Sequence, residues 1–186
     1  MDAMTLLLDR QSHGRLQGPA PTAGQMEMIY RAALRAPDHG ELRPWRFIEY
    51  SGAGREILGA LFARAEQDDN PDVSEKTLEK ARSRPLRAPV VIAVIAAVTI
   101  DHKVPRIEQV LSAGCAAHAM LYAAHAQRLG AMWRTGGFAH HPSVRRAMGL
   151  GPHDELVGFL YLGHCARGDR APRPLEPRDF VERVEA

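Results

Sequence analysis

The segment from residue 90 to residue 98 constrains the fold more than any other part of the chain. Its sequence, Val-Val-Ile-Ala-Val-Ile-Ala-Ala-Val, is apolar without interruption and rich in β-branched side chains. A strand with one solvated face would alternate apolar and polar residues, whereas a continuous run of this kind predicts a strand buried on both faces. The sequence therefore predicts a sheet in which this strand is central and covered on both sides.

Composition sets the broad class of protein. The chain has 186 residues, of which 45% are hydrophobic, so it is long enough for one domain that folds without disulfides. The net charge is +2 and the basic residues are scattered, so no nucleic-acid partner is expected. Cys115 and Cys165 form no CxxC motif, which favours a reducing, cytoplasmic location. The start lacks a signal-peptide pattern and the longest apolar run, 88–98, is too short for a membrane helix, so no membrane partner is expected.

Capping residues and apolar periodicity predict the helices. Asp2 caps a short helix that ends near Asp9, and Thr22 with Gln25 forms a capping box for a second helix. A long helix from about 105 to 129 is apolar around most of its circumference, so it is expected to be central and to suit a subunit interface. The remaining helices are expected at 54–67, at 71–82 behind Asn70, and at 142–148, and further strands at 45–50, 131–135 and 156–162.

Four polar loops carry residues suited to holding a ligand, at 10–12, 35–46, 101–105 and 133–137. Arg10 and Ser12 could bind a phosphate, although on this segment alone the favoured role of Arg10 is to compensate the negative end of its helix. None of these loops offers an activated nucleophile, a pair of carboxylates or a metal motif; His118 and His125 are seven positions apart, too far to share a metal. This pattern is typical of a protein whose cofactor performs the chemistry.

The loops and their spacing resemble those of the compact FMN-dependent nitroreductase family. The segments that carry the resemblance are Arg10-Gln11-Ser12, Arg35 to His39 with Pro44 to Phe47, His102 to Arg106 with Glu108, Ser112 to Cys115, Trp133 to Gly136, and Val157 to Gly163. The resemblance covers nearly the whole chain. It implies an α+β fold with a central, mainly antiparallel sheet flanked by helices, in a single domain of residues 1–186. It also implies an intertwined homodimer with one FMN at each of two interface sites.

The resemblance implies a role for each loop. Arg10, Gln11 and Ser12 would hold the phosphate and ribityl chain, and Trp133, Arg134 and Thr135 would line the flavin. Arg35 and His39 would reach the flavin of the partner subunit. A segment near the nicotinamide nucleotide is implied at Ala123, Ala124, His125, Ala126, Gln127 and Arg128. Because reduced flavin is anionic around N1 and O2, a nearby cation favours reduction, and Lys103 is a candidate for it, with Arg10 as the competitor.

The expected activity is oxidoreduction. A hydride would pass from NADH or NADPH to FMN and on to a nitroaromatic, a quinone or another electron-poor acceptor, in a ping-pong cycle that needs no catalytic side chain.

A phosphate could be bound by the basic group Arg82, Arg84 and Arg87, but a solvated linker is favoured for these residues. The tail from about 165 to 186 is expected to be extended, either loose or packed on the partner subunit. Two alternatives remain open: a flavin- or nucleotide-binding protein without turnover, and a metal-dependent hydrolase that uses some of the nine histidines.

Overall fold

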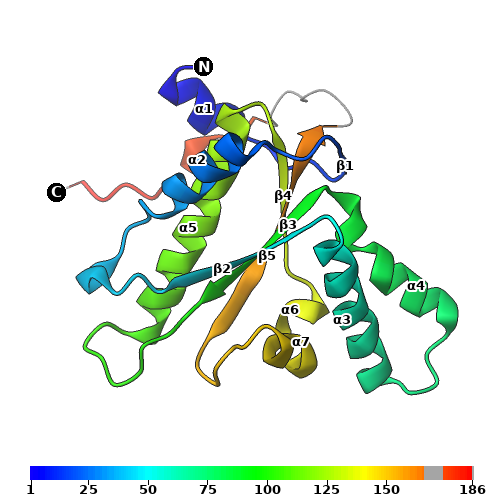
Figure 1. Ribbon diagram of the computed structural model, residues 1–186. Helices are drawn as coiled ribbons and strands as arrows, with labels where there is room; N and C mark the ends of the chain where they lie inside the picture. Colours follow the sequence, from blue (N-terminus) through cyan, green and yellow to red (C-terminus); the bar gives the residue numbers. More distant parts are fainter. Residues whose placement is uncertain (166–173, 186) are drawn as a thin grey trace.

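A computed structural model describes residues 1–165 and 174–185 of the chain. Its centre is a five-stranded sheet, which Figure 1 shows between two groups of helices. The strand order is β1 (Leu16–Gln17), β5 (Glu155–Cys165), β3 (Val90–Ala96) and β2 (Trp45–Ser51), and β4 (Gly130–Arg134) also pairs with β5. Each of these strand pairs is antiparallel. The predicted α+β architecture with a mainly antiparallel sheet is confirmed.

Strand β3 is the central strand that its sequence predicted. All seven of its residues are buried, and it pairs with β2 on one edge and with β5 on the other. Val91, Ala93 and Ile95 enter one apolar cluster, and Val90, Ile92 and Val94 enter the other. Because successive side chains of a strand point to opposite faces, β3 forms part of both cores at once.

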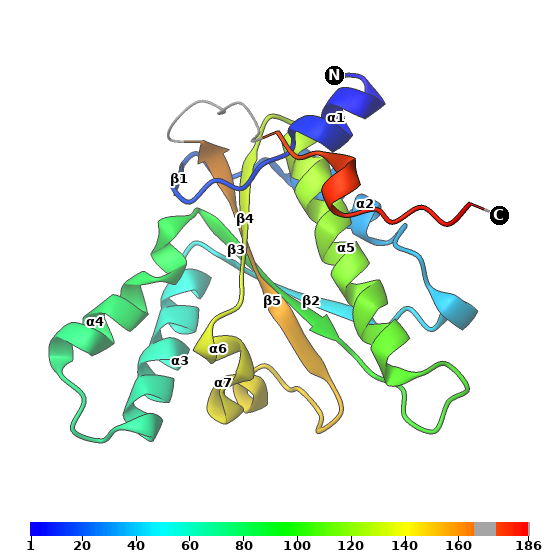
Figure 2. The same ribbon diagram turned by 180° about the vertical axis from the view of Figure 1, so that it is seen from behind.

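Helices cover both faces of the sheet (Figures 1 and 2). On one face lie α2 (Ala23–Ala33) and α5 (Arg106–Ala126), with α1 (Ala3–Asp9) packed against α5. On the other face lie α3 (Gly54–Asp69), α4 (Glu75–Ser83), α6 (Gly137–His140) and α7 (Pro142–Ala147). Short 3₁₀ turns occur at η1 (His39–Glu41), η2 (Pro85–Arg87) and η3 (Pro177–Asp179).

The helix caps predicted at the first two helices are confirmed. Asp2 accepts hydrogen bonds from the N–H groups of Met4 and Thr5, and Thr22 forms a reciprocal capping box with Gln25.

The predicted start of α4 and the predicted end of β5 were wrong, and β3 and α5 end at Ala96 and Ala126, before the predicted 98 and 129. The prediction of a helix from Pro71 was wrong because Asn70 caps only a turn, through Asp72 N–H, and the helix begins at Glu75 behind Ser74. Strand β5 continues past 162 to Cys165, because β1 supplies partners for His164 and Cys165.

Helix α5 has one core face and one exposed apolar face. Its alanine-rich stripe, with Ala113, Ala117 and Met120, is fully buried against the sheet and α2. Ile107 and Leu111 point away from this core, and each keeps 60% of its surface exposed. On α1, Met4, Leu7 and Leu8 are likewise more than half exposed. We call these five residues the α1–α5 apolar face.

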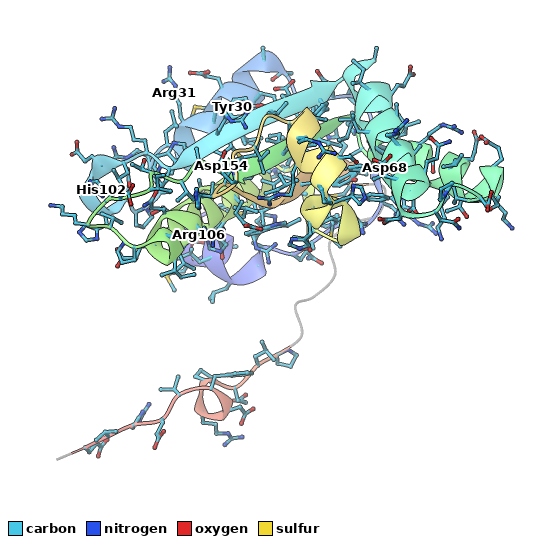
Figure 3. The ribbon with its side chains drawn as sticks, turned by 90° about the horizontal axis from the view of Figure 1, so that it is seen from below. Tyr30, Arg31, Asp68, His102, Arg106 and Asp154 are labelled. Carbon is cyan, nitrogen blue, oxygen red and sulfur yellow. The ribbon has the colours of Figure 1, made fainter. Side chains whose placement is uncertain are left out.

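The C-terminal segment stands apart from the domain. Figure 3 shows the part containing η3 away from the sheet and its helices, and residues 174–185 are exposed throughout. The rest of the predicted tail, 166–173 and 186, lies outside the described residues, so its predicted packing on a partner subunit stays a prediction. In the described part of the chain, no helix combines the length and apolar character needed to cross a bilayer.

Candidate functional site

The loop that follows α1 lies beside β4. The N–H of His13 donates a hydrogen bond to the carbonyl of Ala131 over 2.9 Å, which ties this loop to the strand. A Cβ atom added at Gly14 would lie 3.8 Å from Nη2 of Arg134. Two of the predicted segments, Arg10–Ser12 and Trp133–Thr135, are therefore neighbours in one chain. The guanidinium of Arg10 lies 5.9 Å from the ring centre of Tyr122 on α5.

Gly158 on β5 determines where Trp133 lies. The indole N–H of Trp133 donates a hydrogen bond to the carbonyl of Val157 over 3.2 Å, so the ring lies across β5. The backbone of Gly158 has φ of +149°, and a Cβ atom there would overlap Nε1 of Trp133 and approach the carbonyl oxygen of Arg134 to 2.8 Å. A glycine is required because any side chain would displace the tryptophan.

A cavity of about 340 Å³ opens at the end of β4. Its walls combine flat aromatic rings, the backbone of Thr135 and Gly136, and three guanidinium groups. The lining residues are Phe62, Arg84, Arg87, Met132, Trp133, Arg134, Thr135, Gly136, Phe138, Phe159 and Tyr161. An aromatic-walled cavity with convergent polar groups is the usual form of a small-molecule site. This lining suits a planar ring that carries hydrogen-bond acceptors at one edge.

The three arginines of the cavity have no counter-charge among the described residues. No carboxylate there lies within ion-pair distance of Arg84, Arg87 or Arg134, and their guanidinium groups make no hydrogen bond to that part of the chain. Arg84 instead lies 4.9 Å from the ring centre of Phe138, and Arg134 lies 5.6 Å from that of Tyr161. Burial raises the pKa of the Tyr161 hydroxyl, and the positive charges of Arg134, Arg87 and Arg84 oppose that rise.

Arg84 and Arg87 are the site residues that sequence reasoning missed. The sequence favours a solvated linker over a phosphate contact for both, and Arg84 does not fit a solvated linker, because it is only partly exposed and has a buried Nε. Because α4 ends at Ser83 and η2 turns the chain, residues 84 and 87 reach the cavity while Arg82 stays on the surface. The spacing of the three arginines alone could not show this, since it depends on where the helix ends.

The other predicted residues form a second cluster at the N-terminal end of α5. Nδ1 of His39 lies 2.7 Å from Oε2 of Glu108. Gly40 lies beside the side chains of His102 and Val104, so the loop that carries Lys103 borders the turn that carries His39. Arg35 follows the end of α2 and is exposed, as are His39 and Lys103.

One chain does not bring the two clusters together. Tyr122, beside Arg10, and Glu108, beside His39, are fourteen positions apart on α5, which is roughly 21 Å at 1.5 Å per residue. Lys103 belongs to the His39 cluster and therefore lies away from Trp133 of its own chain. Figure 3 shows His102 of this cluster on the opposite side of the molecule from Asp68 at the end of α3.

Most residues of the segment 123–128, which is expected to contact the nicotinamide nucleotide, pack within the domain. Ala124 and His125 are buried in the core under α5. Gln127 donates hydrogen bonds to the carbonyls of Gln25 and Ala123, which joins α5 to the start of α2. Ala126 and Arg128 are exposed, and contact between this segment and the nicotinamide nucleotide stays a prediction.

Metal chemistry finds no support in the arrangement of the histidines. Within the described ranges, no group of three or more His, Cys, Asp or Glu side chains lies close enough to hold a metal ion. His118 is exposed on α5 and forms an edge contact with Tyr122, whereas His125 is buried.

Comparison with known proteins agrees with this fold. The chain belongs to the nitroreductase family, whose model matches residues 7–164. It is 47% identical over 163 residues to the Escherichia coli K12 protein named "Putative NAD(P)H nitroreductase YdjA", covering 88% of each chain. A Haemophilus influenzae protein named "Putative NAD(P)H nitroreductase" is 39% identical over 184 residues, which are 97% of this chain and 98% of that one.

Solved structures confirm the fold. A nitroreductase-like family protein from Bacillus cereus matches with a TM-score of 0.83 at 20% identity, covering all of this chain and 97% of the other. A Bacteroides fragilis nitroreductase with bound FMN matches with a TM-score of 0.73 at 18% identity, with both chains fully covered. The resemblance to the compact nitroreductases is confirmed, and membership of the family supports an oxidoreductase.

Proposed function

We propose that the protein is a homodimeric, FMN-dependent oxidoreductase that takes a hydride from NADH or NADPH and passes it to an electron-poor acceptor. One observation carries the proposal. The two clusters of ligand-holding residues lie at opposite ends of α5, and the α1–α5 apolar face runs between these ends. A two-fold axis through this face would bring His39 of one subunit to the Trp133 cavity of the other. Five large apolar side chains, each more than half exposed, favour burial in such an interface.

The residues present suit FMN. The cavity has flat aromatic walls for a planar ring, and its guanidinium groups, including the unpartnered buried Nε of Arg84, can donate to the ring's oxygen and nitrogen acceptors. Arg10 with Ser12 and the adjacent backbone would hold the phosphate, with Gln11 on the ribityl side, because guanidinium and hydroxyl donors bind phosphate oxygens well. When bound, FMN supplies the hydride chemistry and the chain supplies position and charge.

The chain's own residues would set the course of turnover. Trp133, Arg134 and Thr135 would hold one side of the ring, and Arg35 and His39 of the partner subunit would close the site from across the interface. Glu108 lies 2.7 Å from Nδ1 of His39, which would leave Nε2 available to a ligand. The other side of the ring would stay open to a nicotinamide donor and then to an acceptor, giving ping-pong kinetics. Nitroaromatics and quinones are the proposed acceptor classes.

A flavin-binding protein without turnover would use the same pocket, and a simple measurement separates the two functions. The purified protein is mixed with FMN, and binding is followed by flavin absorbance and fluorescence. NADH or NADPH is then added without oxygen. Bleaching of the bound flavin, followed by its return when a quinone is added, is the expected result. Binding without bleaching would leave only the non-catalytic function, and absence of binding would exclude both.

The shared site predicts a specific result in mixed dimers. Arg10→Ala and His39→Ala each remove one contributor, so each homodimer should bind FMN weakly. When the two variants are co-expressed with different tags, the mixed dimer should contain one intact site, made by Arg10 of one chain and His39 of the other. Recovery of about half the FMN per mixed dimer is expected. If both residues serve the same chain's site, the mixed dimer will recover none.

The interface itself is tested with Leu111→Glu, which places a charge in the α1–α5 apolar face. We expect this variant to be monomeric by light scattering and to bind FMN weakly while retaining its fold by circular dichroism. The matched control is Ile57→Glu, since Ile57 is a similarly exposed apolar residue on α3, 62% exposed and outside that face. A dimer that persists in Leu111→Glu, or is lost equally in Ile57→Glu, contradicts the proposed interface.

A further inference from the structure

Arg84 differs from the neighbouring arginines in its surroundings. It follows α4 directly, and its side chain lies over Phe138 at 4.9 Å with its Nε atom buried and without a hydrogen-bond partner. Arg82, two positions earlier, is on the surface and forms ion pairs with Glu75 and Glu79. Arg84 is therefore a partly desolvated cation that the described part of the chain does not neutralise, whereas Arg82 is already paired.

Two acidic groups lie near Arg84 but do not pair with it. Glu66 and Asp69 border a smaller adjoining cavity of about 160 Å³ that Arg84 also lines. Asp69 is paired with Nε2 of His141 at 3.2 Å, and neither acid lies within ion-pair distance of Arg84. The charges that face the main cavity are thus the guanidiniums of Arg84, Arg87 and Arg134. A cavity lined by three cations is stabilised when a negatively charged group binds in it.

We propose that Arg84 is the residue that sets the reduction potential of the bound flavin, by stabilising the negative charge that the ring acquires. This inference rests on the proposed function, in which the ring lies against Trp133–Thr135. Two electrons and one proton from the reductant enter the ring, so the neutral oxidised ring becomes singly negative, with the charge at its pyrimidine edge. A cation beside that edge favours the reduced state without taking part in proton transfer.

The structure favours Arg84 over the other cations for this role. Lys103 lies with His39 at the other end of α5 and is exposed, and Arg10 lies over Tyr122 on the side expected to meet the phosphate. Arg87 is exposed, and Arg134 has no buried donor atom that lacks a partner among the described residues, whereas Arg84 has its Nε. Since solvent screens a charge less when its group is buried, the charge of Arg84 acts more strongly inside the cavity than that of Arg87.

The experiment compares Arg84→Gln with Arg84→Lys and with the matched control Arg82→Gln. Each variant is saturated with FMN, and its flavin is reduced in the presence of a redox dye to obtain the midpoint potential. FMN dissociation constants are measured in parallel. We expect Arg84→Gln to reduce the equilibrium constant for reduction about tenfold, a fall of about 30 mV for a two-electron couple. Arg84→Lys should recover most of this shift, and Arg82→Gln should match the wild type.

The outcomes separate this inference from the proposed function. Wild-type protein that binds no FMN refutes the proposed function itself. Wild-type protein that binds FMN, with an Arg84→Gln variant of unchanged potential, overturns only the role of Arg84. If Arg84→Gln weakens the binding of oxidised and reduced flavin equally, the proposed role of Arg84 is also overturned, because the arginine would then act only as a binding contact. Salt dependence adds a further check: because Arg84 is partly buried, the difference in potential between wild type and Arg84→Gln should change little as ionic strength rises, and a difference that disappears in high salt would contradict the role of Arg84.

Discussion

Replacing Gly158 by alanine should damage the domain and its site together. The glycine has φ of +149°, a region that residues with a side chain rarely adopt. The new methyl group would also overlap the indole nitrogen of Trp133 and lie 2.8 Å from the carbonyl oxygen of Arg134. The tryptophan would have to move away from β5, which breaks its hydrogen bond to Val157.

The expected loss of stability follows from these two effects. Backbone strain costs about 1–2 kcal/mol for a residue with a side chain in a disfavoured region. Overpacking against a strand and a tryptophan costs about 1–3 kcal/mol more. The free energy of unfolding should therefore fall by about 2–5 kcal/mol, which is a large part of the roughly 5–15 kcal/mol typical of a folded domain.

The measurement is urea unfolding of the flavin-free protein, followed by circular dichroism and tryptophan fluorescence. Gly24→Ala is the matched control, because Gly24 lies in α2 with open space where the Cβ would be placed. That variant should be neutral or slightly stabilised, since alanine is the better helix former. FMN affinity should fall in Gly158→Ala and stay unchanged in Gly24→Ala. A loss below about 1 kcal/mol in Gly158→Ala, with unaltered tryptophan fluorescence, would refute the reasoning.

Two further predictions concern stability. Burial, together with the hydrogen bond to Glu49, raises the pKa of Tyr30 above its usual range, and burial also raises the pKa of Tyr50 and Tyr161. A tyrosine in the unfolded chain releases its proton near pH 10, whereas these three tyrosines stay protonated in the folded protein. Their contribution to the free energy of unfolding is therefore fully present below about pH 10 and is lost as the pH rises further. The loss is at most about 1.4 kcal/mol per pH unit for each tyrosine. Urea titrations from pH 8 to pH 11 should show this decline in the free energy of unfolding. The free energy should fall less steeply with pH in Tyr30→Phe than in the wild type, and an equal pH dependence in that variant would exclude Tyr30 as a contributor. Gln109→Leu should cost about 2–3 kcal/mol, because the buried amide bonds the N–H of Thr99 and the carbonyls of Thr99 and Val104. Exposed Gln67→Leu is its control, expected within about 0.5 kcal/mol of wild type, and equal effects of the two would contradict a structural role for the amide.

Helices and strands whose limits depend on neighbouring residues could be predicted from the sequence alone. The unbroken run in β3 predicted burial on both faces, and the side chains of Asp2 and Thr22 predicted where α1 and α2 begin. The start of α4 was predicted too early because Asn70 and Ser74 are both good caps, and sequence alone gave no way to choose between them. The two-residue strand β1 was missed because its pairing depends on β5, about 150 positions later.

The arrangement of the candidate site could not be predicted without the three-dimensional fold. The pairing of His39 with Glu108 joins residues 69 positions apart, and the position of Arg84 depends on where α4 ends. Family resemblance supplied the identity of several site residues, but it did not show that they form two clusters at opposite ends of α5. That separation follows from the direction of α2 relative to α5, which no single segment encodes.

The central position of β3 also affects synthesis of the chain on the ribosome. Its first partner, β2, precedes it, but its second partner, β5, begins about 60 residues after β3 ends. At a typical elongation rate of 5–20 residues per second, one edge of this apolar strand stays unpaired for roughly 3–12 s. An exposed edge with such a sequence is prone to pair with other chains. Nascent chains of this protein should therefore depend on chaperones most strongly in that interval, and truncation before β5 should yield aggregates.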